Sequence, residues 1–193
     1  MHQLVPEAEI VSVDIDPVVV KLAKKYFNYQ ENTQVQTQLK DGRVYVKRAL
    51  LKNEQFDWII LDAFNGDYIP EHLMTKEFLG EVKALLTPGG IISANTFSNS
   101  KLYDYESVTY QQVFGKLHIF NAPTKGNRVI FGCNCENFDN FPKFSKELQK
   151  QMDVFKIDLK QVWRRLNDKV DWNTNSDPLT DQYSPANLLK QDD

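Results

Sequence analysis

The 193-residue chain lacks the features that mark membrane, secreted and nucleic-acid-binding proteins. No apolar run approaches the roughly 20 residues that a membrane span needs. Residues 1–20 are interrupted by four acidic residues, which argues against a signal peptide. The formal net charge is -3, whereas a general nucleic-acid binder needs a basic face. We therefore expect a cytoplasmic protein that binds small molecules and neither nucleic acid nor a membrane.

Cysteine is scarce, since the chain contains only Cys133 and Cys135. This spacing differs from that of zinc-binding motifs, and no second pair of metal ligands stands near it. We interpret the pair as two thiols on a strand, and we expect no metal site.

Glycine is sparse as well, and none of the 8 glycines falls in a GxGxxG pattern. In nucleoside-binding sheets such a loop follows the first strand, and an acidic residue about 20 positions later binds the ribose. Asp14 ends a strand-like segment and fits that acidic residue. Counting back about 20 positions from Asp14 passes the start of the chain. We therefore expect the first strand and its glycine loop to be missing from this sequence.

Strand and helix patterns alternate along most of the chain. Asp16 and Pro17 are the expected N-cap and first residue of the first helix, and residues 87–90 (TPGG) predict a turn. This order predicts an α/β fold with a doubly wound, mostly parallel sheet and a C-terminal antiparallel hairpin. The predicted strands are 9–15, 33–39, 56–61, 91–94, 117–120 and 128–132, and the predicted helices are 18–27, 43–51, 71–86 and 102–114, with two helical pieces in 144–166.

We divide the chain into two parts. Residues 1–143 are predicted to form a Rossmann-like nucleoside-binding domain, and residues 144–193 a helical segment and tail packed on the same domain. Tyr103, Tyr105 and Tyr110 could line a cleft, but aromatic residues at this spacing are more typical of packing.

Short polar residues follow the predicted strands, with Asp62 at the centre of the pattern. The unbroken apolar run before Asp62 predicts a strand buried inside a parallel sheet. Because the carboxyl ends of parallel strands share one edge, we expect Asp14, Asp41, Asp62 and Asn95 to converge. Carboxylates in one cleft repel one another and favour a cationic or hydroxyl-rich ligand. Taken singly, Asp41-Gly42 is also a common turn pattern.

Several segments together resemble the spermidine synthase-like family. These proteins are polyamine aminopropyltransferases with the Rossmann-like fold of S-adenosylmethionine-dependent methyltransferases. The segment at 61–78 is the most specific, whereas LTPGG occurs across methyltransferases. The segments are VDIDP (13–17), KDGR (40–43), LDAFNGDYIPEHLMTKEF (61–78), LTPGG (86–90) and LTDQYSPANLL (179–189).

The resemblance implies a role for each residue of the site. Asp14 would bind the ribose, Asp41 and Gly42 the adenine, and Asp62 would accept the proton of the attacking amine. Asn65 stands where the housekeeping enzymes carry a second acid, and we expect Asn65 and Asp67 to contact the amine. The reaction would transfer an aminopropyl group from decarboxylated S-adenosylmethionine to an amine such as putrescine, without a metal.

Two alternatives stay open. The first is a methyltransferase of the same fold that uses S-adenosylmethionine, although the chain has no Asn-Pro-Pro-Tyr-like motif. The second is a non-catalytic remnant that acts as a binding or dimerisation scaffold, which the absence of a glycine loop favours. Loss of a central strand would expose apolar surface, so we expect a partner chain or a rearranged sheet to cover it. The expected assembly is a homo-oligomer, namely a dimer.

Overall fold

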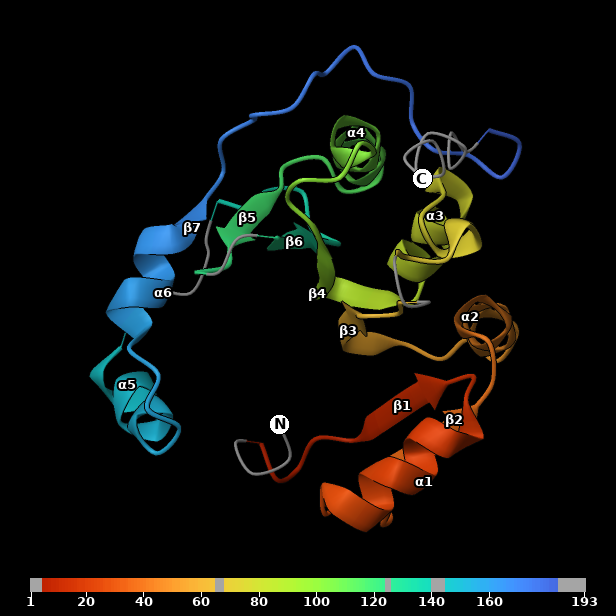
Figure 1. Cartoon of the computed structure of the whole chain (residues 1–193), viewed down its shortest axis with the longest axis vertical. Coiled ribbons are helices and arrows are strands. Elements are labelled where there is room, and N and C mark those ends of the chain that lie inside the picture. The colour runs from red at the N-terminus through yellow and green to blue at the C-terminus, as the bar shows by residue number, and fades with distance from the viewer. Residues whose placement is uncertain (1–4, 65–67, 124–125, 140–144, 184–193) are drawn as a thin grey trace, which may run out of the picture. The chain divides into compact units, whose positions relative to one another are not determined.

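The computed structural model describes residues 5–64, 68–123, 126–139 and 145–183. The chain forms two compact units, Met1–Lys52 and Asn53–Asp193 (Figure 1). No helix of the described part is long and apolar enough to cross a membrane.

The first unit is a parallel two-stranded sheet with two helices. Strands β1 (Ile10–Asp14) and β2 (Val35–Leu39) alternate with helices α1 (Pro17–Tyr26) and α2 (Gly42–Leu51). Asp16 caps α1 by accepting a hydrogen bond from the backbone N–H of Val18 at 2.7 Å. The predicted cap and the proline that follows it are therefore confirmed.

The second unit contains a five-stranded sheet of order β3-β4-β6-β5-β7. Strands β3 and β4 are parallel, and the other three neighbouring pairs are antiparallel. The predicted C-terminal hairpin (β5-β6) and the two helical pieces are confirmed. The elements are β3 (Phe56–Leu61), a 3-10 helix (Glu71–Leu73), α3 (Lys76–Ala84), β4 (Leu86–Phe97), α4 (Tyr103–Phe114), β5 (His118–Asn121), β6 (Asn127–Cys133), α5 (Lys146–Asp153), α6 (Leu159–Arg165) and β7 (Leu166–Asn167).

The α/β class is confirmed, although the described strands form two sheets rather than one. Among the described strands of the second sheet, β3 pairs with β4 alone and stands at the edge. Trp58 and Ile60 are each 49% exposed, so the expectation that this strand is buried is wrong for these two side chains. An apolar run alone does not distinguish a central strand from an edge strand.

Strand β4 is longer than the predicted strand 91–94. Phe56 pairs with Leu86 and Trp58 pairs with Ile91, so residues 87–90 form an irregularity inside the strand. Gly89 has a φ of 82°, which favours glycine. The turn signal of TPGG thus produces a bulge, and the strand resumes beyond it.

The predicted helix 71–86 is interrupted, and that prediction is corrected accordingly. Thr75 lies between the 3-10 helix and α3 in an extended conformation (φ -77°, ψ 154°), so one helix cannot run through it. Its hydroxyl oxygen accepts a hydrogen bond from the N–H of Phe78 at 3.2 Å and caps α3. Thr75 therefore ends the segment that follows Asp62.

Helices α3 and α4 lie side by side over the second sheet (Figure 1). Their buried side chains, such as Leu79 and Val108, belong to the same core as Ile92 and Ala94 of β4. The C-terminal tail returns to these helices, because the N–H of Leu179 donates to the hydroxyl of Thr109 at 2.8 Å. The division after residue 143 stays a prediction.

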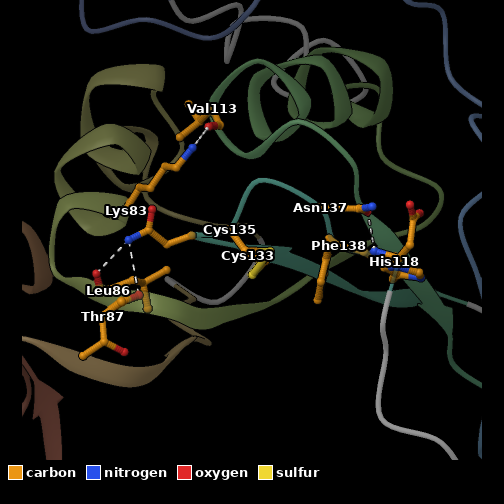
Figure 2. The surroundings of a disulfide bond; sticks show 11 residues. Lys83, Leu86, Thr87, Val113, His118, Cys133, Cys135, Asn137 and Phe138 are labelled. Carbon is orange, nitrogen blue, oxygen red and sulfur yellow. Dashed lines mark hydrogen bonds between the residues drawn. A yellow bond between two sulfur atoms is a disulfide. The ribbon is translucent and has the colours of Figure 1, made fainter.

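Cys133 and Cys135 form a disulfide, so the interpretation as two thiols is wrong (Figure 2). Strand β6 ends at Cys133 and the chain bends at residues 134–136, so the two Cα atoms lie 5.3 Å apart, a separation that suits a disulfide. Asn134, between them, donates from its side chain to the carbonyl oxygens of Leu86 and Thr87 at 2.9 and 3.2 Å. The disulfide therefore lies at the end of β4 that is remote from Phe97.

Candidate functional site

Asp14 and Asp41 lie at the same edge of the first sheet. Asp14 is the last residue of β1 and pairs with Leu39, and Asp41 follows the end of β2. Asp14 Oδ1 accepts from the N–H of Asp16 at 2.8 Å, and Asp41 Oδ1 accepts from the N–H of Val44 at 3.0 Å. These bonds orient both carboxylates at the carboxyl edge of the strands, where open α/β sheets bind ligands.

Gly42 is the first residue of α2, immediately after the Asp41 cap. The structure therefore brings Asp14, Asp41 and Gly42 to one edge of the first unit, as the sequence predicts. Both carboxylates are half-buried. Ionised carboxylates only accept hydrogen bonds, so this edge suits a ligand that offers hydroxyl or amino donors.

Asp62 begins a chain of hydrogen bonds in the second unit. Its Oδ1 accepts from Nδ2 of Asn95 at 2.9 Å, and Oδ1 of Asn95 accepts from Nδ2 of Asn127 at 3.0 Å. The register explains these contacts: Leu61 pairs with Ala94, so the next residues, Asp62 and Asn95, are neighbours. The structure thus brings Asp62 and Asn95 together, as predicted, and adds Asn127, which the sequence analysis missed.

The side chain of Asp62 is exposed apart from this amide contact. An amide that donates to one oxygen fixes the carboxylate while the rest of the group faces solvent. Such a group can bind a cationic amine and accept its proton. Among the described residues, no group of three or more histidine, cysteine or acidic side chains could hold a metal ion.

Aromatic side chains support the segment that follows Asp62. The ring of Phe97, at the end of β4, meets the ring of Phe64 edge-on and stacks on that of Tyr68, with centroids 5.4 Å apart in both cases. Asn65 and Asp67 lie outside the described residues. Their expected contact with the amine stays a prediction.

Glu106, a buried acid of α4, contacts this segment. Glu106 Oε1 accepts a hydrogen bond from the hydroxyl of Tyr68 at 2.8 Å, and Arg128 Nη2 lies 3.6 Å from Oε2. Burial raises the pKa of Glu106 to about 7, although Arg128 and Tyr68 favour the charged form. Burial and the charge of Glu106 also raise the pKa of Tyr68, so that its hydroxyl stays protonated and donates.

Sequence reasoning missed this cluster, although one signal was present. Arg128 and Ile130 alternate with half-buried residues along β6 and share its buried face. A cation on the buried face of a strand requires an acidic partner. Glu106 is an acid on the buried face of α4 and meets that requirement.

The structure describes the predicted residues within two separate units. Asp14 and Asp41 belong to the first unit, and Asp62 and Asn95 to the second. The predicted convergence of all four stays a prediction.

Comparison with known proteins adds a family and a fold. Residues 2–137 match the model of the spermine/spermidine synthase domain. The polyamine aminopropyltransferase of Vibrio vulnificus is 46% identical over 193 residues, which cover 98% of this chain and 64% of that protein. The chain therefore spans less than two thirds of the length of this curated relative.

Two solved structures have a similar fold. A probable spermidine synthase from Corynebacterium glutamicum gives a TM-score of 0.62 at 22% identity and covers 79% of this chain and 56% of that one. Human methyltransferase-like protein 13, in complex with SAH, gives a TM-score of 0.67 at 21% identity. The match covers 97% of this chain and 81% of that one. The chain thus has the Rossmann-like fold that methyltransferases share.

Proposed function

Because this chain belongs to the spermine/spermidine synthase domain family, we propose that it transfers an aminopropyl group from decarboxylated S-adenosylmethionine to an amine such as putrescine. The observation that carries the proposal is Asp62, an exposed carboxylate at the end of β3 that Asn95 orients. The 46% identity to a polyamine aminopropyltransferase supports the same reaction.

In this proposal the first unit binds the nucleoside. Asp14 accepts hydrogen bonds from the ribose hydroxyls, and Asp41 with Gly42 contacts the adenine. Their location at the carboxyl edge of two parallel strands supports these roles. A protein of the same fold is known with SAH bound, which supports a ligand related to S-adenosylmethionine.

Asp62 acts on the amine. The amine nitrogen attacks the propyl carbon next to the sulfonium, and the C–S bond breaks with its electron pair moving to sulfur. Methylthioadenosine leaves, and the proton of the attacking nitrogen passes to Asp62 and then to solvent. Asn95 holds the carboxylate in the receiving orientation, and Asn65 and Asp67 bind the rest of the amine. Positioning of the two reactants supplies much of the rate.

A methyltransferase activity on the same fold is the second candidate. The likeness to human methyltransferase-like protein 13 extends over 97% of the chain and favours it. Product analysis distinguishes the two, because S-adenosylmethionine would then yield a methylated product. A third possibility is a scaffold without catalysis, in which methylthioadenosine binds but no substrate pair turns over.

The test compares Asp62→Asn with Asp57→Asn. Both residues are acids at β3, but Asp57 contacts the hydroxyl of Thr87, toward the opposite end of the strand. We expect Asp62→Asn to lower kcat about 100-fold or more, since general base catalysis contributes at least that factor. Asp57→Asn should retain the activity of the wild type. Full activity of Asp62→Asn would exclude Asp62 as the base.

Nucleoside binding is tested separately by calorimetric titration with methylthioadenosine. Asp14→Ala should abolish saturable binding, whereas Glu9→Ala, an exposed acid just before β1, should leave it unchanged. Equal affinities of the two variants would remove Asp14 from the site.

A further inference from the structure

A buried pair of charges in the second unit has no part in the chemistry proposed above. Arg128 is 0% exposed and Glu106 is 1% exposed. Arg128 Nε donates to the hydroxyl of Thr96 at 2.9 Å, and its guanidinium lies 3.7 Å from the centroid of the Tyr103 ring. Burying two charges costs more free energy than an apolar pair of the same size. Stability alone therefore does not explain the pair.

The pair is also incompletely satisfied. Glu106 Oε2 and Arg128 Nη1 are both buried, and neither makes a hydrogen bond to the described residues. A buried polar atom without a partner costs roughly 1–3 kcal/mol. Buried polar atoms of this kind need an explanation beyond the packing of the core.

The buried cluster contacts the segment that follows Asp62 through Tyr68. The hydroxyl of Tyr68 donates to Glu106 Oε1 at 2.8 Å and accepts from the hydroxyl of Ser100 at 2.9 Å. Tyr68 and Ile69 also pack on an apolar cluster of Met74, Leu102 and Leu179. Glu106 therefore fixes the position at which this segment meets α4.

Strands β4 and β6 carry both the asparagines near Asp62 and two members of the buried cluster. Asn95 donates to Asp62, and Asn127 donates to Asn95. Along their strands, Asn95 adjoins Thr96 and Asn127 adjoins Arg128, and Arg128 donates to the hydroxyl of Thr96 in the buried cluster. Neighbouring residues of a strand point to opposite faces, so the strands present the amides on one face and the buried cluster on the other. A shift of Arg128 would move the backbone that carries Asn127.

From this geometry we infer that Glu106, acting through Tyr68, is a positioning residue for Asp62. The inference rests on the proposed role of Asp62 as the base. Glu106 holds Tyr68, the ring of Tyr68 holds Phe97, and Phe97 lies two residues beyond Asn95 on the same face of β4. Glu106 and Tyr68 act on Asp62 through these contacts and not on the substrate.

The test removes the Tyr68 hydroxyl, which joins the described part of the segment to Glu106. In Tyr68→Phe the ring still stacks on Phe97, but the bond to Glu106 is lost. The matched control is Tyr105→Phe, because Tyr105 packs on the same apolar cluster and its hydroxyl makes no hydrogen bond to the described residues. Both variants lose one oxygen atom from a tyrosine.

We expect Tyr68→Phe to lower kcat about tenfold while the KM for the nucleoside changes less than twofold, because a misplaced base slows the reaction and leaves the first unit intact. Tyr105→Phe should match the wild type in both constants. A structural role alone would lower the folded fraction of Tyr68→Phe, which urea unfolding measures, and would leave the kcat of the folded protein unchanged. Unchanged kcat in Tyr68→Phe would overturn the inference.

A second measurement does not depend on turnover. Amide hydrogen exchange in peptides that cover residues 68–75 should be at least threefold faster in Tyr68→Phe than in the wild type and unchanged in Tyr105→Phe. If the wild type proves inactive, the proposed function fails, and this exchange still decides whether Glu106 holds the segment. Equal exchange in the wild type and Tyr68→Phe would refute that contact.

Discussion

At the scale of single residues, burial of Glu106 determines how its proton affects stability. Burial raises the pKa of this carboxyl from 4.5 to about 7. The folded state therefore binds the proton more tightly than the unfolded state does. Its stabilising contribution is complete below pH 4.5 and is lost as the pH rises through about 7.

We expect Glu106→Gln to remove the decrease in stability that ionisation of Glu106 causes as the pH rises. Relative to the wild type, the variant should gain free energy of unfolding as the pH rises from 4.5 to 7.5, because a neutral amide cannot ionise. Urea unfolding at several pH values measures the difference. Exposed Glu136→Gln is the control and should follow the wild type at each pH. A difference between Glu106→Gln and the wild type that does not vary with pH would contradict the prediction.

Local residue patterns predict part of the site. Asp16 and Pro17 identify the start of α1 because an N-cap depends on neighbouring residues only. The contact of Asp62 with Asn95 follows from the general rule for parallel strands. The contact of Glu106 with Tyr68 joins residues 38 positions apart and depends on how α4 packs. No local pattern in the sequence encodes that packing.

At the scale of elements, Thr75 couples α3 to the C-terminal tail. Its hydroxyl oxygen accepts from the N–H of Phe78, and the same hydroxyl donates to Asp181 Oδ1 at 2.7 Å. One side chain thus caps a helix and binds a residue 106 positions later. The predicted continuous helix 71–86 is wrong because capping at Thr75 outweighs the helical pattern on either side.

We expect Thr75→Ala to lower the free energy of unfolding by about 1–2 kcal/mol, since it removes an N-cap and the bond to the tail. Thr75→Ser is the matched control, because it keeps the hydroxyl and should lose less than half as much. Urea denaturation of both variants gives the comparison. Equal losses would show that the methyl group of Thr75, and not its hydroxyl, stabilises this corner.

Hydrophobic periodicity predicts where most helices and strands lie along the chain. It does not predict which elements lie next to each other in the fold. Strand β3 has the apolar run of a central strand but lies at the edge of its sheet, with Trp58 half exposed. Periodicity reports which residues avoid water and says nothing about which strand pairs with which. The disulfide does not follow from the sequence either, because the spacing of Cys133 and Cys135 argues against a metal site but does not show that the chain bends between them.

At the scale of the whole molecule, helix α1 carries apolar side chains that its own unit does not bury. Helix α1 has no buried residue, and its half-buried side chains include Val20 and Ala23. A second, exposed stripe recurs at helical spacing along the same helix. Its members are Val18, Val19, Leu22 and Tyr26. An exposed apolar stripe of this kind is typical of an interface between chains.

We therefore expect the chain to self-associate through this stripe, as the dimer expected from the sequence requires. Sedimentation at micromolar concentrations should give a mass above that of one 22.4 kDa chain. Leu22→Glu should shift the protein toward the monomer, because a charge in an apolar interface loses its hydration. Lys21→Glu, which changes an adjacent exposed position of α1, should leave the association unchanged. A wild-type protein that stays monomeric at 100-fold higher concentration would show that α1 does not mediate contact between copies.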